Sequence, residues 1–326
     1  MTMLLEVETL AVDIATPRGS ERVVNGATFS LAEGGSLGVV GESGSGKTMT
    51  ALALMGLAPE SATVSGSIRF EGRELVGLSE EALRPLRGDQ IAMIFQEPMT
   101  ALNPLHRVGA QVAEPLILHR RMTKAAAFER AVRLLEHVRL ADPGRAAHAY
   151  PFALSGGERQ RAMIAMAIGC SPRLVIADEP TTALDVTVQA QILALIDGLR
   201  RESGMALLLV SHDLAVIAGH CERVIVMYAG LVMESGPVEA ILSDPKNPYT
   251  RALLEARPEP GAPRGARLKA IPGSPPVHHE TGPGCAFAGR CELTVDVCRT
   301  TPPPQVAFGP ERLSRCHRAR EMGRSP

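Results

Sequence analysis

The sequence contains no tryptophan, and only 3% of its 326 residues are aromatic. Proteins that bind single-stranded nucleic acid stack bases on aromatic rings, and so few rings make such a surface hard to build. The formal net charge is −1, from 34 basic and 35 acidic residues, so bulk electrostatic attraction to nucleic acid is absent as well. The composition therefore predicts a protein with no nucleic-acid partner.

Long hydrophobic runs are also missing. No apolar run approaches the ~18–20 residues needed to cross a bilayer, and the start of the chain lacks the basic region of a signal peptide. The composition, 45% apolar and 21% charged, is that of an ordinary soluble globular protein. The length suits one large domain with an appendage, or two domains. We expect a location in the cytosol or on the cytosolic face of a membrane.

Short apolar runs that end in polar groups alternate with helical stretches. These runs predict strands at 36–41, 91–96, 174–178, 206–212 and 223–230, with an edge strand at 3–14. Helices are predicted at 47–57, 184–202 and 212–219. The alternation predicts a three-layer α/β core with a largely parallel sheet.

The strand pattern disappears between 97 and 171. Residues 124–140 place a row of apolar side chains, from Phe128 to Val138, on one face at helical spacing. We therefore expect 97–171 to be a helical subdomain inserted into the core. Residues 256–284 are dense in Pro and Gly without periodicity, which predicts a linker or an irregular surface segment.

A glycine-rich stretch, GESGSGKT, follows the first buried run and precedes a helix. Its pattern is that of a phosphate-binding loop, in which backbone N–H groups of residues 42–48 wrap a β-phosphate at a helix N-terminus. Lys47 would reach the β- and γ-oxygens, and the Thr48 hydroxyl would bind Mg²⁺. The predicted nucleotide-binding residues here are Gly41, Glu42, Ser43, Gly44, Ser45, Gly46, Lys47 and Thr48.

An acidic pair ends the run RLVIADEP. Asp178 would lie at the carboxyl edge of the sheet, where α/β proteins bind ligands, and would hold the Mg²⁺. Glu179, one residue further on, would orient or deprotonate the attacking water. An acidic pair after a strand is also common in solvated turns, so this assignment depends on the glycine loop.

A second helix N-terminus with glycines occurs in LSGGERQ, residues 154–160. Ser155 would cap the helix, and Gly156 and Gly157 would expose N–H groups to an anion. For this stretch alone, an ordinary helix cap is the simpler interpretation. Together with the glycine loop and the acidic pair, it resembles the signature of the ATP-binding-cassette (ABC) superfamily, which carries a P-loop NTPase fold.

Three further residues match motifs of that family: Gln96 the Q-loop, Asp185 the D-loop and His212 the switch histidine. The resemblance implies that ATP and Mg²⁺ bind, that Glu179, His212 and Gln96 are catalytic, and that Gln96 also contacts the metal. The resemblance extends over residues 1–245, which we expect to form an ABC ATPase domain.

One position departs from the family pattern. An aromatic ring usually stacks on the adenine, whereas the first aromatic residue here is Phe29. We expect Ile14, with Arg18 or Val23, to hold the base by aliphatic packing.

The subfamily is indicated by residues 95–104, 180–193 and 247–254 and by the tail, which look like the peptide/nickel import branch. That resemblance implies an ATPase driving import of di- or oligopeptides, with nickel or another small solute as the alternative. It also implies a second, non-identical cassette, two membrane permeases, an external substrate-binding protein and a peripheral place at the inner membrane. A cassette acting on DNA or ribosomes, and a redox regulator, are less favoured alternatives.

Four of the six cysteines, Cys285, Cys291, Cys298 and Cys316, lie in the extension 246–326. A cytosolic setting disfavours disulfides, so the crowding predicts a metal. Zinc suits four thiolates but usually uses a close C-x₂₋₄-C pair, whereas iron–sulfur clusters accept irregular spacing. The spacing of the cysteines alone is compatible with zinc, with an iron–sulfur cluster or with no metal. Resemblance to tails of peptide-import cassettes favours a structural [4Fe–4S] cluster.

Overall fold

The computed structural model describes residues 2–17, 19–182, 184–256, 270–276 and 282–322. The chain forms two compact units, each assembled from separate stretches of sequence. Unit 1 comprises Met1–Leu4, Leu31–Ser36 and Gly77–Val210, and unit 2 comprises Leu5–Ser30, Leu37–Val76 and Ser211–Pro326. Within the described ranges, no helix is both long enough and apolar enough to span a membrane.

The parallel strands of unit 1 lie in the order β8 (Ala206–Ser211), β7 (Leu174–Asp178) and β6 (Ile91–Ile94). Every residue of these strands is buried, as expected for a parallel sheet between layers of helices. Ile94 pairs with Ala177, so β6 and β7 end at the same edge. The segments that follow them therefore start side by side.

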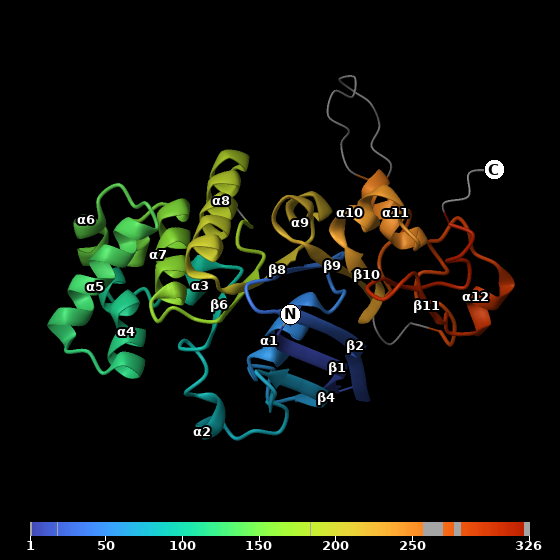
Figure 1. Cartoon of the computed structure of the whole chain (residues 1–326), viewed down its shortest axis with the longest axis horizontal. Helices are drawn as coiled ribbons and strands as arrows, with labels where there is room; N and C mark the ends of the chain where they lie inside the picture. Colours follow the sequence, from blue (N-terminus) through green and yellow to red (C-terminus); the bar gives the residue numbers. More distant parts are fainter. Residues whose placement is uncertain (1, 18, 183, 257–269, 277–281, 323–326) are drawn as a thin grey trace. The chain divides into compact units, whose positions relative to one another are not determined.

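The interval 97–171 in unit 1 is helical, as expected (Figure 1, green). Its helices are α3 (Pro98–Ala101), α4 (Val108–Arg120), α5 (Lys124–His137), α6 (Pro143–His148) and α7 (Gly156–Ile168), with a 3₁₀ turn at Pro151–Ala153. Helices α4 to α7 pack on one another, and Ala131 and Leu135 from the predicted apolar face of α5 are buried. Unit 1 also contains α2 (Glu80–Leu83) and α8 (Val186–Ser203).

Unit 2 contains an antiparallel sheet in the order β2 (Gly19–Ala32), β1 (Met3–Thr16), β4 (Ala62–Phe70) and β5 (Arg73–Glu74). The sequence predicts β1 but not β2 or β4. The reason is visible in β2, where only Val24, Ala27 and Leu31 are buried. A strand with so few buried residues has too few apolar side chains to show a periodic pattern.

Other strands of unit 2 adjoin the glycine loop. Strand β3 (Ser36–Val40) is parallel to β9 (Arg223–Tyr228) and leads into α1 (Lys47–Leu54). Strand β10 (Leu231–Pro237) pairs antiparallel with β9, and α9 (Leu214–His220) precedes β9. Gly38 in β3 is needed for packing, because a Cβ there would lie 2.1 Å from the Ile217 side chain.

The C-terminal extension continues this sheet. Strand β12 (Leu313–Arg315) pairs antiparallel with β10, and β11 (Gln305–Ala307) pairs with β12. The remaining helices are α10 (Val238–Ser243), α11 (Pro248–Glu255) and α12 (Asp296–Thr300). A buried ion pair of 2.9 Å joins Arg312 to Glu234 of β10. The extension is thus part of the folded core of unit 2, which its Pro- and Gly-rich sequence does not reveal. Most of the predicted linker at 256–284 lies outside the described residues.

Candidate nucleotide-binding site

The glycine loop of unit 2 has the shape that a phosphate-binding loop requires. A Cβ on Gly41 would lie 2.1 Å from the Met227 carbonyl oxygen, so no larger residue fits there. Gly46 has φ 97°, and a Cβ on it would lie 2.6 Å from the Val23 carbonyl oxygen. Gly44 also has a positive φ, of 76°, but its Cβ position is open, with nothing within 4 Å. The two ends of the loop are packed and its middle faces open space.

Lys47 lies inside this loop. Its side chain is 5% exposed and its Nζ donates to the carbonyl oxygens of Gly41 (2.8 Å) and Glu42 (3.0 Å). The buried Ser45 hydroxyl, in contrast, has no hydrogen-bond partner. A buried cation in a loop whose middle is open fits a triphosphate, because anionic phosphate oxygens would pair with the lysine.

Glu42 makes contacts that the sequence does not predict. Its backbone N–H donates to the Tyr249 hydroxyl (2.9 Å), and its carboxylate pairs with Arg290 (2.6 Å). Among the backbone N–H groups of residues 42–48, the N–H of Glu42 is therefore already hydrogen-bonded to Tyr249. Burial raises the pKa of the Tyr249 hydroxyl, so this partner is neutral.

The acidic pair of unit 1 follows β7. Asp178 ends the strand and is 2% exposed. Glu179 has a positive φ of 43°, in the left-handed region that costs a non-glycine residue about 1–3 kcal/mol. Its N–H donates to the Val210 carbonyl oxygen (3.0 Å), and its carboxylate accepts the Thr182 hydroxyl (3.0 Å). The backbone of Glu179 is thus held in an unfavourable conformation that places this carboxylate at the end of the sheet.

Gln96 reaches the same carboxylate. Its Nε2 donates to Glu179 Oε2 over 3.4 Å. The contact follows from the register of β6 and β7, which end beside each other. The structure therefore brings together two of the predicted catalytic residues within unit 1.

The LSGGERQ stretch forms the start of α7. Ser155 is the N-cap, and it forms a capping box in which Glu158 N–H donates to Ser155 Oγ (3.3 Å) and Ser155 N–H donates to Glu158 Oε2 (2.8 Å). The hydrogen bond from the Ser155 N–H lowers the pKa of Glu158. Ser155 and Gly156 remain exposed. The stretch is thus a helix cap with an accessible N-terminus, and its role as a nucleotide-binding signature stays a prediction.

The start of α8 lies beside the start of α7. Asp185 caps α8, its Oδ1 accepting the Val188 N–H (3.0 Å). A Cβ on Gly157 would lie 3.1 Å from the Val188 side chain, and one on Gly156 would lie 3.4 Å from that of Leu184. Glycine at 157 therefore lets the start of α7 pack closely on α8, whereas a Cβ on Gly156 would make only an ordinary contact with Leu184.

His212 follows β8 and is exposed, next to Ser211, whose hydroxyl accepts the Asp213 N–H (3.0 Å). It belongs to unit 2 with the glycine loop, whereas Gln96, Asp178 and Glu179 belong to unit 1. The γ-phosphate role of His212 and the Mg²⁺ site of Thr48, Gln96 and Asp178 stay predictions.

The predicted adenine contacts are described in part. The Val23 carbonyl approaches Gly46, which places this residue of β2 beside the glycine loop. Ile14 pairs with Ala62 at the end of β1. Arg18 lies outside the described residues.

Comparison with known proteins defines the class to which this fold and site belong. The family model "ABC transporter" matches residues 24–182, and "Oligopeptide/dipeptide transporter, C-terminal region" matches residues 233–298. A solved structure of the dimeric ATP-binding cassette MJ0796, in a post-hydrolysis state with ADP and Pi, has a TM-score of 0.64 at 28% identity. The similarity covers 72% of this chain and 98% of that one. The expected ABC-type P-loop fold is confirmed.

Two relatives are similar along nearly the whole chain. The oligopeptide transport ATP-binding protein OppD of Salmonella typhimurium is 49% identical over 96% of this chain and 93% of its own length. A probable peptide ABC transporter ATP-binding protein, y4tR, of Sinorhizobium fredii is 47% identical over 98% and 96%. The chain belongs to the family of oligopeptide transport ATP-binding proteins, and its ATPase domain is of the ABC class.

The metal prediction for the extension is wrong. The four cysteines do line one cavity, of about 20 Å³, with room for about one water molecule. Yet across the described residues, no three side chains of His, Cys, Asp or Glu are grouped so as to hold a metal ion. The residues present therefore fit neither the [4Fe–4S] cluster nor its zinc alternative.

Burial also affects the protonation of these thiols. Burial raises the pKa of Cys285 and Cys291 and raises that of Cys316 to about 11. Without a metal, this buried environment therefore favours neutral thiols. The cysteines act here as small apolar side chains around Phe287, itself 3% exposed.

Proposed function

We propose that this chain is the ATP-hydrolysing subunit of an importer for di- and oligopeptides. The observation that carries the proposal is the 49% identity over 96% of the chain to an oligopeptide transport ATP-binding protein. The site supports it with a preformed phosphate loop around Lys47 and a carboxylate, Glu179, held at the end of β7.

The proposed reaction is hydrolysis of MgATP. Lys47 and the loop N–H groups bind the phosphates, while Thr48, Asp178 and Gln96 hold the Mg²⁺ that accompanies the substrate. Glu179 receives a proton from the attacking water, and its left-handed backbone and the Thr182 hydroxyl fix its orientation. Phosphoryl transfer depends mainly on such positioning and on charge neutralisation.

A second cassette completes the site. Ser155 and Gly156 present an exposed helix N-terminus, which is suited to cap the γ-phosphate bound by a partner cassette. We propose a non-identical paralogue as this partner. The dimer closes on two ATP molecules and reopens after hydrolysis.

Two permeases and an external substrate-binding protein complete the proposed importer, with this chain peripheral on the cytosolic side of the membrane. Exposed apolar side chains support a docking surface in unit 1. Leu105 is 81% exposed and Met99 58%, both in the segment that follows Gln96, and Phe152 is 68% exposed. Such side chains are typical of a protein-binding surface.

Assembly should raise the ATPase activity. We expect the purified chain alone to hydrolyse ATP slowly and the complex with its second cassette and permeases to be at least about tenfold faster, because completing the site in trans lowers the barrier by about 1.4 kcal/mol or more. In Ser155→Arg, stimulation should fail while nucleotide binding by the same chain is kept. Full activity of a strictly monomeric preparation, independent of its concentration, would refute the shared site.

A further inference from the structure

The C-terminal extension makes direct contact with the phosphate-binding loop in unit 2. Arg290, which lies between Cys285 and Cys291, forms a bidentate ion pair with Glu42, with Nη1–Oε2 at 2.6 Å and Nη2–Oε1 at 3.0 Å. The two residues are 248 positions apart in sequence. The side chains are 8% and 24% exposed, so solvent screens this pair less than a surface ion pair.

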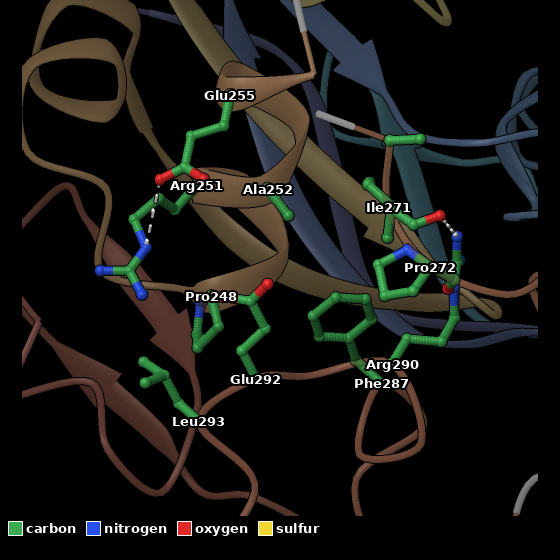
Figure 2. Close-up of a pocket in the computed structure, with 11 residues that line it drawn as sticks. Pro248, Arg251, Ala252, Glu255, Ile271, Pro272, Phe287, Arg290, Glu292 and Leu293 are labelled. Atoms are coloured by element: carbon green, nitrogen blue, oxygen red, sulfur yellow. Dashed lines mark hydrogen bonds and ion pairs between the residues drawn. The ribbon is translucent and has the colours of Figure 1, made fainter. Parts of the chain in front are cut away.

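Arg290 is itself held in place. Its Nε donates to the Pro272 carbonyl oxygen (2.7 Å), and Nη1 donates to the Tyr228 hydroxyl (3.2 Å). Figure 2 shows Arg290 with Ile271, Pro272 and Phe287 in the wall of a cavity of about 190 Å³. An arginine with its donors fixed in this way defines the position of the carboxylate that it binds.

Three buried rings support the contact. Tyr228 of β9, Tyr249 of α11 and Phe287 of the extension have centroids 4.6 to 5.3 Å apart. Tyr249 also accepts the Glu42 N–H, so the backbone and the side chain of Glu42 are both fixed. The carbonyl of Glu42 in turn accepts a hydrogen bond from Lys47 Nζ. A continuous set of contacts thus runs from the extension through Glu42 to the lysine that binds phosphate.

We propose that Arg290 is a positioning residue for ATP: by pairing with Glu42, the extension holds the phosphate-binding loop in its nucleotide-binding shape. This inference rests on the proposed function, because it assigns Arg290 a part in binding the same substrate. Arg290 acts through Glu42 and does not touch the nucleotide. Loss of the pair should weaken ATP binding in a protein that is still folded.

The test is the affinity of the full-length chain for a fluorescent N-methylanthraniloyl analogue of ATP with Mg²⁺. We expect Arg290→Gln and Glu42→Gln each to weaken binding about tenfold, equal to about 1.4 kcal/mol. The double variant should bind no more weakly than either single variant, because both remove one interaction. Glu42→Gln preserves size, so it tests the pair even if Arg290→Gln folds poorly.

Arg223→Gln is the matched control. Arg223 of β9 pairs with Glu311 of the extension at 3.0 Å, away from the loop, and its loss should leave the affinity unchanged. Wild-type affinity in Glu42→Gln and in folded Arg290→Gln would overturn the proposal, as would equal weakening in Arg223→Gln. Failure of the wild-type chain to bind the analogue would refute the proposed function instead.

Discussion

With glutamine in place of Glu179, the protein should bind ATP with unchanged affinity and lose turnover by a factor of about 10² to 10⁴, the range for a general base. The amide keeps the size of the carboxylate and can still accept the Thr182 hydroxyl, which lies 3.0 Å from Glu179 Oε2. It cannot take a proton from water. ATP should therefore remain bound, and the closed dimer should accumulate. Phosphate release and size-exclusion chromatography with ATP measure the two effects.

Glu136→Gln is the control for this variant. Glu136 is exposed on α5 in the same unit, so its substitution removes one charge without touching β7. Its turnover should equal that of the wild type. If Glu179→Gln, assembled with its partners, hydrolysed ATP at the wild-type rate, Glu179 would have no catalytic role.

Lys47→Ala is expected to weaken the binding of ATP, whereas Glu179→Gln is expected to slow its turnover. A charge-assisted contact to the phosphates is lost, and so are the hydrogen bonds from Lys47 to the carbonyl oxygens of Gly41 and Glu42. We expect ATP affinity to fall about a hundredfold, equal to about 2.7 kcal/mol. Isothermal titration with MgATP measures this loss.

Lys124→Ala provides the comparison, because Lys124 is exposed at the start of α5. It should bind ATP as the wild type does. Equal affinities of Lys47→Ala and the wild type would show that the loop does not bind the phosphates through this lysine.

The parts of the site that the sequence predicts are those made by short stretches of chain. The turn from β3 into α1, the cap at Ser155 and the acidic end of β7 each depend on neighbouring residues. Strong local preferences, such as the glycine at 46 with φ 97°, leave a pattern that can be recognised. Strands β3, β7 and β8 are buried along their whole length, and their unbroken apolar runs can also be recognised in the sequence.

The parts that the sequence does not predict depend on distant residues. Tyr249 and Arg290 reach Glu42 from 207 and 248 positions away, and nothing in the glycine loop indicates either partner. The pairing of β12 with β10 also joins parts of the chain that are distant in sequence. The metal prediction was wrong for a related reason. Cysteine spacing along the chain does not show how the four side chains are arranged in the fold, where they line a cavity of only about 20 Å³.

Uptake of peptide by whole cells tests the central claim most directly. In the organism that encodes this chain, deletion of its gene should abolish ATP-dependent uptake of a radiolabelled di- or oligopeptide, and the wild-type gene should restore it. Genes carrying Lys47→Ala or Glu179→Gln should not restore it, although the proteins accumulate. Uptake that is unchanged by the deletion, or a loss confined to another solute such as nickel, would contradict the assignment to peptide import.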